Sequence, residues 1–175
     1  MTDQDYCKFN PKVSAPLHTL TRKEAMQHYE LFISQIEGRI EELQKLLKDS
    51  NIELDFSLDS VQQIDEWFID NMHFNNFGQL SSKSFSICND LSMYLGEIVK
   101  RSCPSVDWKL NTIKSSDISY HRPVLMGFNV KNKNYNIDFD LILCQYAHRV
   151  IKGNIDKGLL VKMVSSALNK CKNEI

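Results

Sequence analysis

The sequence is poor in glycine, and the glycines that it has are far apart. Of its 175 residues only six are glycine, and no two of them lie closer than five positions. Phosphate-binding loops of the P-loop and dinucleotide types need glycines in the patterns GxxxxGK[ST] and GxGxxG, because the backbone must approach the phosphate closely, and neither pattern occurs in the sequence. The GxSxG nucleophile elbow and the HExxH zinc motif are also missing. These absences argue against the common nucleotide-binding and hydrolase families.

Long apolar stretches and an excess of one charge are missing as well. The longest uncharged, mainly apolar stretch is Leu141–Ala147, far short of the roughly 20 residues that span a bilayer. The first nine residues carry two aspartates and no apolar run, so we expect no secretory signal. The formal net charge is −1. It offers no reason to expect binding to nucleic acid or to a membrane surface.

Paired cysteine motifs are absent too. The five cysteines are odd in number and scattered, and no two have the CxxC spacing of a zinc or redox site. We expect all of them to be reduced, to pack as small core residues and to bind no metal or cofactor. This cysteine usage predicts a cytoplasmic protein. The residues concerned are Cys7, Cys88, Cys103, Cys144 and Cys171.

Helical periodicity dominates the first hundred residues. Thr21 and Glu24 have the spacing of a capping box, in which each side chain accepts a hydrogen bond from the other residue's amide. Apolar residues then recur every three or four positions, which predicts a helix over 22–48. Ser57 has the place of an N-cap for a second helix, which ends near Asn71.

A third helix is predicted from about Ser82 to the residue before Pro104, since proline disfavours helical geometry at the position before it. Gly96 falls inside this helix. Glycine there costs roughly 1 kcal/mol relative to alanine. We expect another backbone to pack closely against Gly96 and to compensate for that cost.

The apolar period changes from helical to alternating after Pro104. Residues 106–110 read as a half-buried strand, residues 123–130 as a second strand, and residues 135–139 as a third after a hairpin loop. Two helices follow, over 141–152 and 156–172.

This order predicts an α+β fold, with N-terminal helices, a small antiparallel sheet and C-terminal helices. Residues 1–20 contain two prolines and no periodicity, so we expect them to form an irregular arm. Residues 21–175 are predicted to form a single α+β domain of ordinary size.

Four oxygen-bearing side chains alternate with the apolar residues of the last predicted strand: Asn134, Asn136, Asp138 and Asp140. Such ligands suit calcium, but calcium loops need a tight glycine turn that a straight strand does not provide. A solvated strand face is the better interpretation. The loop Ser119–Arg122 is polar enough to face a ligand, but one loop does not define an activity.

The best candidate site from the sequence lies on the third helix. Asp90, Tyr94 and Glu97 are spaced by four and three residues, so they share one edge of the helix. With Trp108 they are predicted to line a pocket between this helix and the sheet. The competing interpretation is a core tyrosine flanked by two solvated carboxylates.

Charge is unevenly distributed along the chain. Residues 37–97 hold twelve acidic and four basic residues, whereas residues 98–175 hold six acidic and thirteen basic ones. The two parts can simply attract each other within one fold. The alternative is an acidic face that binds a basic partner protein. Its predicted residues are Glu41, Glu42, Asp65 and Glu66.

Several segments occur in an order that resembles a family of uncharacterised bacterial cytosolic proteins, found mainly in Gram-positive species. They are LTRKEAMQHYELFISQIEGRIEEL, LDFSLDSVQQIDEWF, DLSMYLGEIV, PSVDWKL and PVLMGF, within about residues 20–130. The resemblance implies an α+β domain and supplies no catalytic residues. The positions that match it are Tyr94, Gly96, Glu97, Trp108 and 123–128.

Together these patterns favour a non-enzymatic module that binds another protein, such as an immunity or antitoxin-like factor. The alternative is a small-ligand binder or enzyme with its pocket between the third helix and the sheet. The sequence leaves the oligomeric state open.

Overall fold

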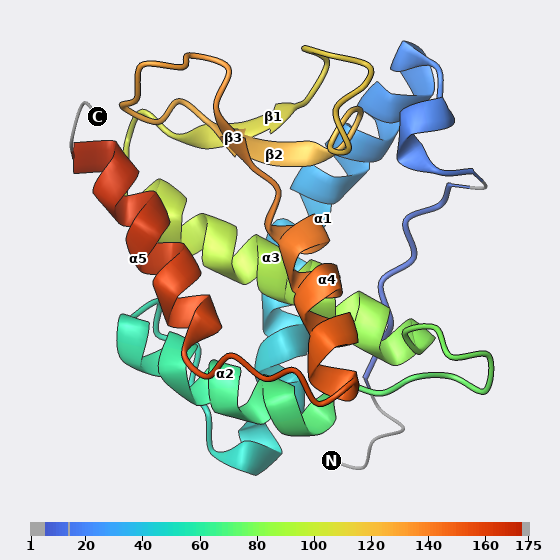
Figure 1. The fold of residues 1–175 in the computed structure, drawn as a ribbon, viewed down its shortest axis with the longest axis vertical. Coiled ribbons are helices and arrows are strands. Elements are labelled where there is room, and N and C mark those ends of the chain that lie inside the picture. Colours follow the sequence, from blue (N-terminus) through green and yellow to red (C-terminus); the bar gives the residue numbers. More distant parts are fainter. Residues whose placement is uncertain (1–5, 14, 173–175) are drawn as a thin grey trace.

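The computed structural model of the protein describes residues 6–13 and 15–172 (Figure 1). Its longest helix, α1 (Arg22–Leu47), begins at the predicted capping box. The Thr21 hydroxyl accepts from the amide of Glu24 at 3.3 Å, and the Glu24 carboxylate accepts from the amide of Thr21 at 2.8 Å. A 3-10 turn, η2 (Lys48–Ser50), ends this helix.

Two further helices have serine N-caps. Ser57 caps α2 (Leu58–Asn71), and Ser81 caps α3 (Ser82–Ser102). Each serine hydroxyl accepts a hydrogen bond from the amide three residues later, which satisfies one donor of the first turn. All three helices lie close to the ranges predicted from apolar spacing.

Helix α3 forms the centre of the molecule (Figure 1). It packs against α1, α4 and α5, and every residue from Ser86 to Gly96 is buried. A helix that is buried all round belongs to a protein core, and the polar residues on it need partners. Within the described part of the chain, no helix is both long and apolar enough to cross a membrane.

The sheet covers one end of the helices (Figure 1). Its strands are β1 (Asp107–Leu110), β2 (Pro123–Met126) and β3 (Asn136–Ile137), in the order β1-β2-β3 with antiparallel pairing. Trp108 pairs with Leu125, which pairs with Ile137. The antiparallel sheet and the α+β class were predicted, although β3 is only two residues long.

Gly96 is close-packed for a different reason from the predicted one. Its neighbour is the indole of Trp108 rather than a backbone: a β-carbon at position 96 would lie 2.1 Å from Cζ2 of Trp108. Trp108 is 2% exposed and meets the ring of Phe32 edge-on at 5.0 Å. The missing glycine side chain therefore makes room for a large aromatic ring from β1.

The last predicted strand is longer than the strand in the structure. The chain leaves the sheet after Ile137 and enters α4 (Phe139–Ile151). Asp138 is the N-cap of this helix, because its Oδ1 accepts from the amide of Leu141 at 2.9 Å. Asp138 and Asp140 therefore do not lie on a solvated strand face.

Helix α5 (Leu159–Lys172) packs against α2 and α3. It begins three residues later than predicted, and its start is held by a residue from α2. The carboxylate of Asp65 accepts from the amides of Gly158 at 2.6 Å and Leu160 at 2.9 Å. An acidic group is favourable at a helix N-terminus, where free amides carry partial positive charge.

Within the predicted arm, the described residues 6–13 and 15–16 contain no helix or strand, and Leu17–Thr19 form a 3-10 turn, η1. Positions 1–5 and 14 of that arm lie outside the described residues. The arm runs past α3 and α1 (Figure 1).

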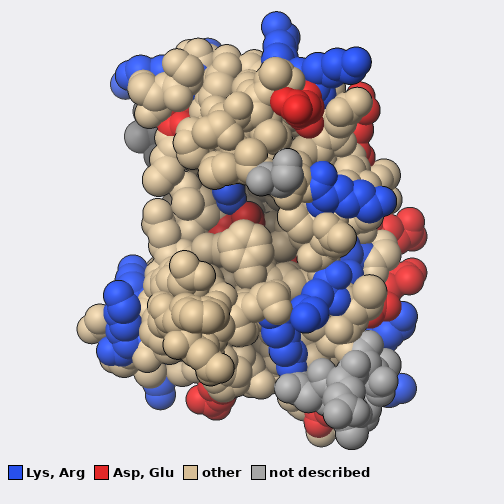
Figure 2. All heavy atoms as spheres, turned by 90° about the vertical axis from the view of Figure 1, so that its right-hand side faces the viewer, with Lys and Arg blue, Asp and Glu red and all other residues tan. Residues whose placement is uncertain are grey.

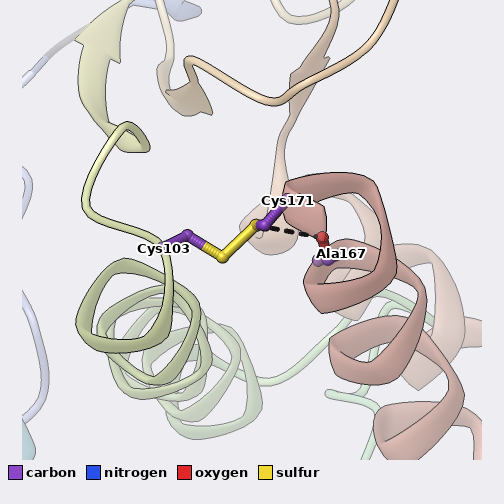
Figure 3. The surroundings of a disulfide bond; sticks show 3 residues. All are labelled: Cys103, Ala167 and Cys171. Carbon is purple, nitrogen blue, oxygen red and sulfur yellow. Dashed lines mark hydrogen bonds between the residues drawn. A yellow bond between two sulfur atoms is a disulfide. The ribbon is translucent and has the colours of Figure 1, made fainter. Parts of the chain in front are cut away.

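Cys103 and Cys171 form a disulfide (Figure 3). The expectation that all five cysteines are reduced is therefore wrong for this pair, which joins the ends of α3 and α5 across 68 positions of sequence. Cys7, Cys88 and Cys144 are free thiols. Because disulfides are rare in the reducing cytosol, cysteine usage no longer supports the predicted cytoplasmic location.

Candidate functional site

The arm forms one wall of a pocket whose other walls come from α1, α3, β2 and α4. We call it the arm pocket; its volume is about 220 Å³. Its lining is largely apolar and includes the rings of Phe9, Phe32 and Phe85. Four polar side chains also line it: His28, Asn89, Arg122 and Asp140. Figure 2 shows a hollow on this side of the molecule, with acidic and basic atoms at its floor between uncharged surfaces.

Arg122 is bound by two carboxylates at the polar end of the arm pocket. Its Nε donates to Oδ2 of Asp138 at 2.6 Å, and its Nη2 donates to Oδ2 of Asp140 at 2.5 Å. The three side chains are 20%, 4% and 19% exposed, so these charges are poorly solvated. The third guanidinium nitrogen of Arg122, Nη1, donates to neither carboxylate.

The sheet explains why these residues meet. Arg122 comes directly before β2, and Asp138 comes directly after β3. Since Met126 pairs with Asn136 and the two strands are antiparallel, the start of β2 lies beside the end of β3. The first turn of α4 then adds Asp140 to the same place.

One of the two carboxylate oxygens of Asp140 has no strong hydrogen-bond donor. Its Oδ2 is held by Arg122, but the partner of its Oδ1 is the Sγ of Cys144 at 3.8 Å, and a thiol is a weak donor. Burial raises the pKa of Asp140, and the charge of Arg122 opposes this shift. A hydrogen bond with Cys88, together with burial, raises the pKa of Cys144, which keeps that group a neutral thiol.

His28 brings an unpaired polar atom to the arm pocket. The side chain projects from α1, the residue is 7% exposed, and its buried Nδ1 has no hydrogen-bond partner among the described residues. Burial lowers the pKa of His28, and the positive charge of Arg122 lowers it further. The imidazole is therefore neutral at neutral pH, and Nδ1 can exchange a hydrogen bond with a ligand.

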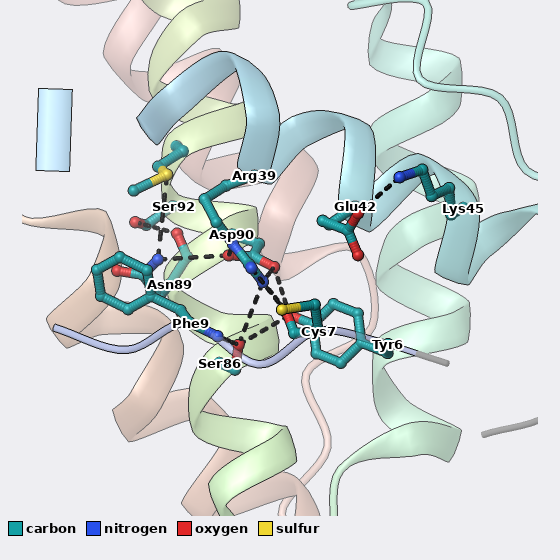
Figure 4. Close-up of polar contacts among 11 residues, drawn as sticks. Tyr6, Cys7, Phe9, Arg39, Glu42, Lys45, Ser86, Asn89, Asp90 and Ser92 are labelled. Atoms are coloured by element: carbon teal, nitrogen blue, oxygen red, sulfur yellow. Dashed lines mark hydrogen bonds and ion pairs between the residues drawn. The ribbon is translucent and has the colours of Figure 1, made fainter. Parts of the chain in front are cut away.

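The arm is held by a buried ion pair between α1 and α3 (Figure 4). Arg39 donates Nε and Nη2 to the two oxygens of Asp90, at 2.8 and 2.6 Å, and donates Nη1 to the carbonyl of Cys7 at 2.6 Å. The hydroxyl of Tyr6 also donates to Asp90. The amide of Phe9 donates to Oγ of Ser86 at 2.6 Å. These bonds position the arm as a wall of the pocket.

The pocket residues predicted on α3 have structural partners. Asp90 anchors the arm, and burial raises the pKa of its carboxyl while Arg39 opposes that shift. Tyr94 accepts from the amide of Phe56 at 2.9 Å. Glu97 accepts from Nε1 of Trp108 at 3.0 Å. A common ligand role for these four residues stays a prediction, and their contacts do not support it.

The predicted acidic face is smaller than expected. Glu41 and Glu66 are exposed, and Glu42 pairs with Lys45 at 2.6 Å. Asp65 is 0% exposed, because it binds the first amides of α5. Asp65 was therefore wrongly assigned to the surface, and a single sequence offers no sign that a helical aspartate caps another helix.

The sequence interpretation missed Arg122, Asp138 and Asp140 as a group, although it noted the polar loop that ends at Arg122. One signal was available: Asp138 followed three residues later by Leu141 has N-cap spacing, and the apolar run of α4 begins there. The alternation with Ile137 and Phe139 concealed it, since a strand pattern explains the same residues.

A wider cavity of about 460 Å³ lies between β3, α4 and α5. Two of its charged residues already have partners. Lys162 pairs with Asp156 at 2.8 Å, and Asp138 is bound by Arg122 and the amide of Leu141. The arm pocket is the better candidate because one of its lining residues, His28, has a buried polar atom without a partner among the described residues.

Comparison with protein families gives one match, over residues 21–145. The matched region contains all four polar residues of the arm pocket, whereas the arm and α5 lie outside it. The chain has no match among curated proteins or solved structures.

Proposed function

The chain belongs to the family described as uncharacterised protein YwmA, and we propose that it binds a small, mainly apolar molecule in the arm pocket. The observation that carries this proposal is His28, which lines the pocket and whose buried Nδ1 has no hydrogen-bond partner among the described residues. An unpaired buried polar atom costs about 1–3 kcal/mol. A ligand that binds it recovers part of that cost.

The composition of the pocket supports the same proposal. Small-molecule sites are typically concave and mainly apolar, with a few convergent polar groups that orient the ligand. The arm pocket combines phenyl rings with His28, Asn89, Arg122 and Asp140.

The protein-interaction module that the sequence favoured has less support. It rested on an acidic face, and of its four residues Asp65 is buried and Glu42 is paired with Lys45. The two that are exposed, Glu41 and Glu66, lie on different helices.

Saturation-transfer NMR with single-ring fragments tests the proposal. The probes are benzylamine, benzyl alcohol and benzoate, which share a ring and differ in charge. The blocking variant is Ala15→Trp, because Ala15 lines the pocket from the arm rather than from the core. The matched control is Ser34→Trp, at an exposed position of α1.

We expect at least one probe to bind the wild-type protein and Ser34→Trp but not Ala15→Trp. If no probe binds, or if binding survives Ala15→Trp unchanged, the arm pocket is not the binding site and the proposal is overturned.

A further inference from the structure

The charges around the arm pocket do not balance. Its polar end holds one guanidinium, Arg122, and two carboxylates, Asp138 and Asp140. His28 adds no charge, since its pKa is lowered by burial. With both carboxylates ionised the group is one positive charge short, in a place where water screens poorly, and a bound cation would keep Asp140 ionised although burial raises its pKa. Buried charges are normally paired, and an anionic ligand would worsen the imbalance.

The two carboxylates differ in what they have left to offer. Both oxygens of Asp138 have strong donors, the Nε of Arg122 and the amide of Leu141. Asp140 has one strong donor, and its Oδ1 meets only the Cys144 thiol. Of the two carboxylates, Asp140 lines the arm pocket and Asp138 does not. The Oδ1 atom of Asp140 therefore lacks both a strong hydrogen-bond donor and a neighbouring positive charge of its own. A cationic donor bound in the pocket would supply both.

The other walls of the arm pocket suit a small ligand that has a cationic group and an apolar part. The rings of Phe9, Phe32 and Phe85 line the same space, and aromatic faces attract ammonium groups as well as apolar ones. A second polar group is available at His28, which lines the pocket and whose Nδ1 has no partner among the described residues. The volume of about 220 Å³ lies below the roughly 300–1,000 Å³ of sites for drug-sized ligands, so the body is small.

We propose that the ligand of the arm pocket is a small primary amine, bound as its ammonium ion, whose N–H groups donate to Asp140 and His28 and whose apolar body packs on the phenyl rings. This inference rests on the proposed function, because it names the chemical class of the molecule that the pocket binds.

The test compares ligands that share a ring and differ only in the head group. Dissociation constants are measured by NMR titration for benzylamine, benzyl alcohol, benzoate and benzyltrimethylammonium. Benzylamine should bind at least about tenfold more tightly than benzyl alcohol, since hydrogen bonds to a charged partner are stronger than neutral ones. Benzyltrimethylammonium keeps the charge but has no N–H, so it should bind more weakly than benzylamine.

Asp140→Asn removes the charge and keeps the shape. It should abolish the preference for benzylamine over benzyl alcohol, and circular dichroism checks that the variant is folded. Asp70→Asn, at an exposed position of α2, is the matched control and should retain the preference.

The two proposals can fail separately. If benzyl alcohol or benzoate binds as tightly as benzylamine, and Ala15→Trp still blocks binding, the amine class is wrong and the pocket function stands. If Ala15→Trp blocks nothing, the pocket function itself fails. The comparison of benzylamine with benzyl alcohol uses the wild-type protein, so it decides the amine class even if Asp140→Asn does not fold.

Discussion

Gly96 is conspicuous at the scale of single residues because its lack of a side chain makes room for Trp108. We expect Gly96→Ala to lower the free energy of unfolding by about 1–3 kcal/mol, as overpacking of a core does, although alanine is the better helix former. The collision is with a ring that is 2% exposed and hydrogen-bonded to Glu97, so it cannot move cheaply. Urea denaturation measures the change.

Gly38→Ala is the control for this substitution. Gly38 is also helical, but it is exposed, and a β-carbon there would meet nothing within 4 Å. That variant should gain roughly 0.5–1 kcal/mol from helix propensity alone. If Gly96→Ala gains stability as well, the close-packing explanation is wrong.

His28 should make stability depend on pH. Its pKa is lowered from 6.5 in the folded state by burial and by Arg122, so the unfolded chain binds the proton more readily. By linkage, the contribution of His28 is fully present above pH 6.5 and is lost as the pH falls through its folded-state pKa. His28→Gln cannot be protonated and should lose less stability than the wild type between pH 7.5 and pH 5.5, values chosen to bracket the unfolded pKa of about 6.5.

Chemical denaturation at a series of pH values gives this comparison. His18→Gln, at an exposed position outside the core, should follow the wild-type curve. Parallel curves for wild type and His28→Gln would contradict the assignment of a lowered pKa.

At the scale of elements, α5 is attached at both of its ends. Asp65 binds the amides at its start, and the disulfide from Cys103 holds Cys171 near its end. The disulfide closes a loop of 68 positions, and a disulfide typically contributes about 2–4 kcal/mol to stability. Cys171→Ser should lower the free energy of unfolding by that amount, with earlier exposure of α5 to amide hydrogen exchange.

Cys7→Ser is the control. Cys7 is an exposed free thiol, so this substitution should leave the free energy of unfolding unchanged. Reductant should lower the thermal midpoint of the wild type and leave that of Cys171→Ser unchanged. An equal midpoint for the wild type with and without reductant would restore the expectation of five reduced cysteines.

At the scale of the whole molecule, the Arg39–Asp90 ion pair connects the core to the pocket through the arm. We expect Tyr6→Phe to loosen the arm, because it removes the hydroxyl bonded to Asp90 and Ser86. Loss of a hydrogen bond to a charged group costs about 1.5–3 kcal/mol. Amide exchange of residues 7–13 should accelerate, and the affinity of the arm pocket for its ligand should fall.

Tyr29→Phe provides a matched control in another part of the molecule. The Tyr29 hydroxyl donates to the carbonyl of Trp108 at 2.8 Å, so its loss should affect stability without accelerating exchange in the arm. Unchanged exchange of residues 7–13 in Tyr6→Phe would show that the Tyr6 hydroxyl does not hold the arm.

Local chemistry sufficed to predict the elements whose signals are contained in a few neighbouring residues. The Thr21–Glu24 capping box, the Ser57 cap of α2 and the three- and four-residue apolar spacing each depend on contacts within one or two turns. The α+β class followed from the change of period after Pro104. The start of α4 was misplaced because Asp138 and Asp140 satisfy a strand pattern and a helix cap equally well.

Only the tertiary structure could decide which distant residues meet. Asp65 binds Gly158, Cys103 bonds to Cys171, and Arg122 binds Asp138 across the β2–β3 pair. The arm pocket depends on such contacts, since its walls come from five separate segments of the chain. Periodicity indicates that a side chain is buried, but it does not identify the residue that the side chain contacts. The chemistry of a buried polar residue depends on that contact.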